Sequence, residues 1–100
     1  MSSIELAFDA ETVSVAGNDL FRIGVTIRGL VFSEKRIERI GKKVEESFQS
    51  VFDGEKLLSK GVRLLPKGAT FFFSTIEKVE SSSMKKMELN FQSLIRERGL

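Results

Sequence analysis

The chain has 100 residues, a formal net charge of +2 at pH 7, and no histidine or cysteine. It therefore lacks the side chain that ordinarily titrates near neutral pH, and the thiolate used in nucleophilic, redox and zinc chemistry. We expect a single α+β domain over residues 1–100 that binds or assembles rather than catalyses, with no cofactor and no metal.

The N-terminal segment carries acids where a secretory signal peptide needs Lys or Arg, and it has no sustained apolar run. The charge-free apolar stretch over residues 69–76 is far shorter than the roughly 20 residues that cross a bilayer as a helix. These features predict a cytoplasmic protein without a membrane partner.

Charge is segregated along the chain. Residues 1–20 contain four acids and no base, whereas residues 21–43 contain seven bases and two acids. A basic segment of this density attracts phosphate or acidic protein surfaces. The alternative is mutual neutralisation of neighbouring strands, with the helix charges solvated.

The first predicted elements are two strands joined by a tight turn. Apolar residues alternate over residues 4–8, and a change of phase predicts a bulge at residues 9–12. Residues 17–19 tolerate positive φ and predict a hairpin turn. Alternation over residues 21–28 predicts the second strand, with Gly29 shifting its phase.

Ser33 predicts the N-cap of a helix over residues 34–52 that ends at Asp53 and Gly54. An acid in the first turn favours this start because of the helix dipole. Gly41 inside the helix indicates close packing or a partner contact. The apolar stripe that faces the core comprises Ile37, Ile40, Val44, Phe48 and Val51.

The second half of the chain repeats the hairpin. Residues 55–60 predict a short helical turn, followed by strands over residues 62–65 and 69–79 that a Pro-Lys-Gly turn connects. Ser81–Ser83 predict the cap of a closing helix with apolar residues at helical spacing. The stripe of this helix comprises Met84, Met87, Phe91, Leu94 and Ile95.

The predicted order is therefore ββαββα. We expect a two-layer sandwich in which a four-stranded, mainly antiparallel sheet carries both helices on one face. The other face of the sheet would then be uncovered.

Three consecutive phenylalanines in one strand predict where a partner binds. Successive side chains of a strand point to opposite faces, so Phe72 faces outward if Phe71 and Phe73 pack under the helices. An exposed ring with arginines around it is typical of a protein interface. The candidate interface comprises Arg22, Thr26, Arg28, Phe72 and Ile76.

Self-association through this face, as a homodimer or larger oligomer, is the first functional hypothesis, and an adaptor contact with another protein belongs to the same class. A loop or residues 55–61 covering Phe72 is the structural alternative. Self-association and an adaptor contact would both make the chain an assembly domain rather than an enzyme.

The competing hypothesis is a nucleic-acid-binding module that uses the basic segment 22–43 together with Phe72. Glutamates interrupt the basic helix face, and neither an aromatic-rich RNA-recognition strand nor a Gly-x-x-Gly clamp is present. The helix residues that would contact phosphate are Lys35, Arg36, Arg39, Lys42 and Lys43.

A third hypothesis is a small hydrolase or transferase. Residues 82–86 match Ser-x-x-Lys twice, but the companion motifs of that chemistry are missing and helix capping explains the serines. Paired carboxylates at Asp9 and Glu11, or Asp53 and Glu55, are the candidate metal ligands.

Overall fold

The computed structural model describes residues 4–50, 57–76, 78 and 80–98, without the side chains of residues 94, 95, 97 and 98. Its elements follow the predicted order ββαββα. They are β1 (Glu5–Val15), β2 (Asn18–Arg28), α1 (Glu34–Gln49), β3 (Leu57–Leu65), β4 (Gly68–Thr75) and α2 (Ser81–Arg98).

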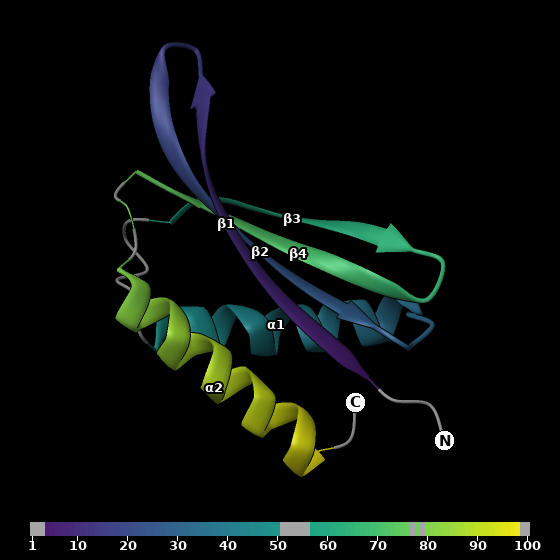
Figure 1. Ribbon diagram of the computed structural model, residues 1–100. Coiled ribbons are helices and arrows are strands. Elements are labelled where there is room, and N and C mark those ends of the chain that lie inside the picture. The colour runs from purple at the N-terminus through teal and green to yellow at the C-terminus, as the bar shows by residue number, and fades with distance from the viewer. Residues whose placement is uncertain (1–3, 51–56, 77, 79, 99–100) are drawn as a thin grey trace.

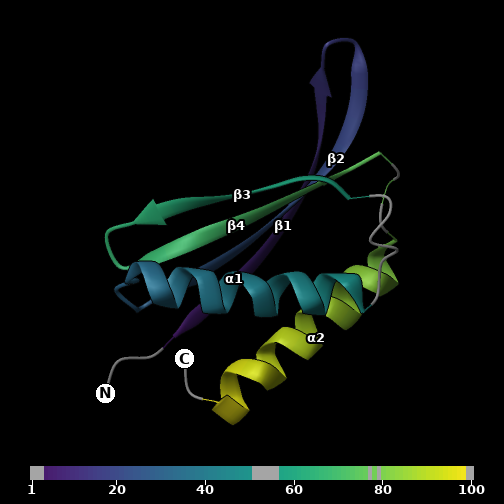
Figure 2. The same cartoon turned by 180° about the vertical axis from the view of Figure 1, so that it is seen from behind.

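The four strands form one sheet in the order β1-β2-β4-β3, and every neighbouring pair is antiparallel. Both helices lie on the same side of this sheet (Figures 1 and 2). The predicted two-layer fold is therefore confirmed. The face of the sheet opposite the helices carries no second layer of described residues (Figure 2).

Aromatic side chains hold the helices against the sheet. Phe48 of α1 stacks on Phe73 of β4 with ring centroids 4.9 Å apart, and Phe91 of α2 meets Phe8 of β1 edge-on at 6.1 Å. α1 therefore packs on a central strand and α2 on the β1 side. The buried core comprises Phe21, Ile23, Val25, Ile27, Ile40, Val44, Phe48, Ala69, Phe71, Phe73, Met87 and Phe91.

The predicted bulge in β1 is wrong, because β1 pairs with β2 over its whole length without a register shift. The pairing of β2 with β4 stops at Phe21, so the end of the β1–β2 hairpin extends beyond the sheet (Figure 1). Val13 lies in this extension, on the face opposite Phe8. The apolar residues of β1 therefore change face where the extended end of the hairpin has no core beneath it.

Gly17 and Gly29, which follow the ends of β1 and β2, adopt positive φ. The first turn is formed by Ala16 and Gly17, with φ of 52° and 81°, so it lies one residue earlier than residues 17–19. Gly29 has φ of 101° and its N–H donates to the Lys67 carbonyl at 2.8 Å. It ends β2 instead of shifting the phase of the strand.

The predicted start of α1 is confirmed, since Ser33 accepts a hydrogen bond from the Arg36 N–H at 3.2 Å. α1 ends at Gln49, before the predicted residue 52, and the predicted end at residues 53–54 lies outside the described residues. Gly41 marks close packing as expected. A methyl group there would lie 3.3 Å from Phe71 Cε1.

The helical turn predicted for residues 55–60 is wrong over residues 57–60, which begin β3; residues 55–56 lie outside the described residues. The pairing with β4 fixes this segment, and a register shift at Leu58 accommodates its extra residue. β4 in turn ends at Thr75 rather than at residue 79.

The closing helix begins at Ser81, and its first backbone hydrogen bond runs from the Met84 N–H to the Glu80 carbonyl at 3.0 Å. The serines therefore form the first turn instead of preceding it. No helix among the described residues is long and apolar enough to span a membrane.

Gly68 is required by close approach of two strands. A Cβ atom at Gly68 would lie 2.2 Å from the Ile27 carbonyl oxygen, whereas one at Gly61 would meet nothing within 4 Å. Because a backbone atom cannot move aside like a side chain, we expect Gly68→Ala to lower the free energy of unfolding by about 2 kcal/mol.

Urea unfolding checks this expectation. Gly61→Ala is the matched control in the neighbouring strand, and it should change the free energy of unfolding by less than about 0.5 kcal/mol. Equal effects of the two substitutions would contradict the described pairing of β2 with β4.

Candidate binding face of the sheet

The sheet face opposite the helices is the candidate site, and strand pairing fixes which residues share it. One row across the four strands contains Asp9 of β1, Gly24 of β2, Phe72 of β4 and Gly61 of β3. Two of these four residues have no side chain. Phe72 is therefore the one large side chain at the centre of the face.

Phe72 is half-buried, while Phe71 and Phe73 are buried beneath the helices. The predicted alternation of the three rings is thus confirmed. The guanidinium carbon of Arg22 lies 5.4 Å from the Phe72 ring centroid, and that of Arg63 lies 5.1 Å from it. A ring between two cations at these distances is held by cation–π attraction.

The space beside the ring is created by Gly24. A Cβ atom at Gly24 would lie 3.6 Å from Phe72 Cε1, so the ring leans over the bare backbone of β2. A hollow of about 50 Å³ remains there. The residues around it are Asp9, Glu11, Arg22, Gly24, Thr26, Thr70 and Phe72.

Polar side chains surround the ring. The hydroxyl groups of Thr26 and Thr70 are hydrogen-bonded at 2.9 Å across β2 and β4, and Arg22 forms an ion pair with Glu11 of β1. The neutralisation expected between an acidic and a basic strand therefore occurs in part. Arg63 has no acidic partner on this face among the described residues, so β3 contributes positive charge there.

The acids of the face are concentrated at one side. β1 presents Glu5, Asp9 and Glu11 at alternate positions on this face and has no base. β3, at the other side of the sheet, presents Arg63. The face is acidic along one edge and basic along the other, with Phe72 between them.

Four of the five predicted interface residues share this face. Arg22, Thr26 and Arg28 alternate along β2, and Phe72 lies beside them on β4. Ile76 is different, because β4 ends at Thr75 and the alternation does not continue to it. Ile76 is 63% exposed just beyond the strand.

The basic residues of α1 are not brought to Phe72. The helix lies under the opposite face of the sheet, so a surface containing both does not form (Figure 1). A shallow cleft on α1 is lined by bases and by Glu38 and Glu46. Of the predicted basic segment, only Arg22 and Arg28 share the face with Phe72. The α1 bases Lys35, Arg36, Arg39, Lys42 and Lys43 are exposed or half-buried on the helix side.

Residues 57–61 do not cover Phe72, since they form the strand beside β4. The side chains of Ser82 and Lys85 are exposed in the first turns of α2. Among the described residues no three His, Cys, Asp or Glu side chains gather as metal ligands. Asp53 and Glu55 lie outside those residues.

Arg63 is the residue of this face that the sequence analysis missed. A strand that includes Arg63 would have indicated this position. Arg63 pairs with Thr70, two residues from Phe72, and so shares the outward face. The prediction that residues 55–60 are helical obscured this relation. A strand beginning at Leu57 makes the alternation over residues 57–65 readable.

No protein-family model, curated protein or solved structure matches the chain.

The contact of Arg63 with Phe72 predicts a measurable coupling. In a double-mutant cycle of Arg63→Ala and Phe72→Leu, we expect a coupling free energy of about 0.5–1 kcal/mol, typical of an exposed cation–π pair. Urea unfolding of the dilute protein measures it.

Arg28→Ala provides the control, because Arg28 lies on the same face at the end of β2 and pairs with Gly68 rather than Phe72. Its coupling to Phe72→Leu should be close to zero. Equal coupling for the two arginines would contradict the arrangement of the ring.

Proposed function

We propose that this chain is a non-catalytic assembly domain that associates with a second copy of itself through the face around Phe72. The observation that carries the proposal is the layout of that face, which is acidic at β1, basic at β3 and aromatic at the centre. An adaptor contact with another protein would use the same surface.

A twofold axis parallel to the strands makes the face complementary to itself. Such an axis places β1 of one copy opposite β3 of the other, and β2 opposite β4. In aligned sheets about 10 Å apart, Phe72 of one copy then lies opposite Gly24 of the other. Each ring leans over Gly24 of its own chain, so the two rings would meet at the centre of the contact, and their burial would remove apolar surface from water.

The same operation pairs opposite charges. Arg63 lies in the row of Ala7, between the rows of Glu5 and Asp9. In the dimer it would therefore face two acids of the second copy. An axis perpendicular to the strands would instead place the acids of one β1 against those of the other, which is unfavourable. Charge thus favours one of the two simple arrangements.

Nucleic acid fits this face less well. Bases stack on exposed rings, but two arginines already lie over the Phe72 ring, and one of them is paired with Glu11. The acids of β1 would repel a phosphate backbone that ran across the sheet. Protein is therefore the partner class that we propose.

Phe72→Glu tests the proposal. It places a charge at the centre of the contact, so we expect the dimer of dilute wild-type protein to become a monomer in light scattering coupled to size-exclusion chromatography. Val31→Glu is the control, because Val31 is 70% exposed and lies outside the strands.

The control protein should remain a dimer. A wild-type protein that stays monomeric would contradict the proposal, as would a dimer that Phe72→Glu leaves unchanged. Retention of wild-type protein on single-stranded DNA, lost steeply with salt, would favour nucleic-acid binding instead.

A further inference from the structure

The outer edge of β3 is a second surface, distinct from the face around Phe72. In the described part of the chain β3 pairs with β4 alone, so its other edge presents unpaired backbone N–H and C=O groups. Three of its large apolar side chains are well exposed: Leu58 at 49%, Val62 at 48% and Leu64 at 60%. Such an edge is a template for another strand.

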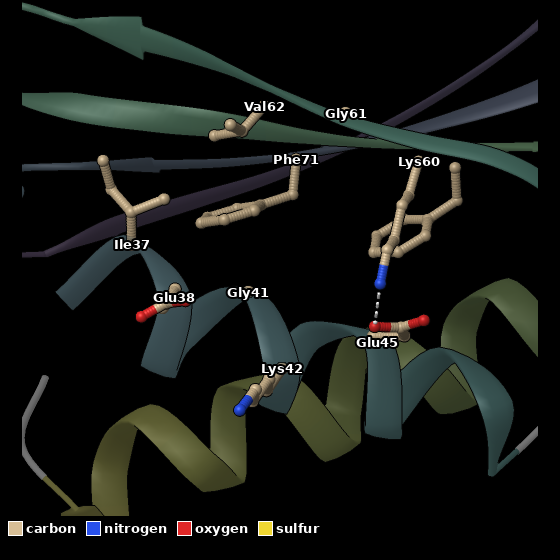
Figure 3. Close-up of a pocket in the computed structure, with 10 residues that line it drawn as sticks. Ile37, Glu38, Gly41, Lys42, Glu45, Lys60, Gly61, Val62 and Phe71 are labelled. Carbon is tan, nitrogen blue, oxygen red and sulfur yellow. Dashed lines mark hydrogen bonds and ion pairs between the residues drawn. The ribbon is translucent and has the colours of Figure 1, made fainter. Parts of the chain in front are cut away.

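A groove lies under this edge, on the helix side of the sheet. Ile37 and Gly41 of α1 form one wall, and Val62 of β3 and Phe71 of β4 form the other (Figure 3). Its volume is about 320 Å³. The ion pair of Lys60 with Glu45, at 2.9 Å, joins β3 to α1 at one end of the groove. The helices thus leave the helix-side surface of β3 incompletely covered.

The charges of the two sheet edges are opposite. β3 contains Lys60 and Arg63 and no acid, whereas β1, the other edge strand, contains three acids and no base. Pairing of β3 with a second β3, or of β1 with a second β1, would bring like charges together. Pairing of β1 with β3 brings Arg63 beside the acids of β1 on the outward face, while Lys60 lies on the helix side with Glu45.

Strand direction favours the same combination. Each neighbouring pair in β1-β2-β4-β3 is antiparallel, so β1 and β3 run in opposite directions. A second copy placed beside the first, in the same orientation and with its helices on the same side, presents its β1 antiparallel to β3. Its α2, which packs under β1, would lie next to the groove.

We propose that the β3 edge binds the β1 edge of a second copy, extending the antiparallel sheet from one molecule to the next. This contact is head-to-tail and leaves one β1 edge and one β3 edge free, so it builds rings or filaments rather than closed dimers. It goes beyond the face contact of Phe72 because it joins strand edges, although Arg63, Glu5 and Asp9 contribute charge to both contacts.

Charge reversal in the Phe72→Glu background tests the edge contact separately from the face contact. One variant adds Arg63→Glu, and the other adds Glu5→Lys and Asp9→Lys. Circular dichroism first checks that each variant is folded. Light scattering at high protein concentration and low salt then gives the mass of each variant alone and of their equimolar mixture.

We expect the Phe72→Glu protein to grow in mass with concentration. Both reversed variants should stay monomeric, because the outward-facing net charges of their β1 and β3 edges no longer have opposite sign. The mixture should associate, since each β1 then finds a β3 of opposite sign. If the β3 variant does not fold, the β1 variant is mixed with the Phe72→Glu protein. The unchanged β3 edge of the β1 variant can still bind the acidic β1 edge of the Phe72→Glu protein.

Three results would overturn the edge contact: a Phe72→Glu protein that is monomeric at every concentration, a reversed variant that associates alone, or mixtures that remain monomeric. A wild-type dimer that Phe72→Glu abolishes, without growth of the Phe72→Glu protein, would retain the face contact and remove the edge contact.

Discussion

The rest of the structure depends on the coverage of one face of a four-stranded sheet by only two helices. Strand alternation sends every second side chain away from those helices, whatever its polarity. Ile23, Val25 and Ile27 of β2 are fully buried on the covered side. In β4 the same alternation buries Phe71 and Phe73 and turns Phe72 outward, so the sheet itself creates an aromatic surface without a core.

The exposed ring is accommodated rather than hidden. The ring lies over the backbone of Gly24, and the guanidinium groups of Arg22 and Arg63 lie close to it. Such contacts shield a single ring in the monomer, and they also arrange charge around it. The layout that stabilises Phe72 in one molecule therefore also determines which second surface it fits: one with acids opposite Arg63 and an apolar group opposite the ring.

The sequence was sufficient for the element order, the helix start at Ser33 and the facing of Phe72, because each depends on local periodicity or capping. It was insufficient where pairing between distant segments decides the outcome. Residues 57–60 are extended because β4 requires a partner, and β1 has no bulge because its pairing with β2 is continuous. For the same reason Arg63 could not be placed beside Phe72.

We expect the Phe72 ring to be accessible in the isolated molecule and protected on association. Fluorine NMR of protein labelled with fluorophenylalanine, with a soluble paramagnetic reagent, measures this directly, and Phe72→Leu assigns the signal. In protein diluted further, until light scattering shows a monomer, the Phe72 signal should broaden far more than that of Phe48, which is 0% exposed. In concentrated protein it should become protected. Equal protection of both rings at dilution, or equal broadening of Phe72 at every concentration, would contradict the account.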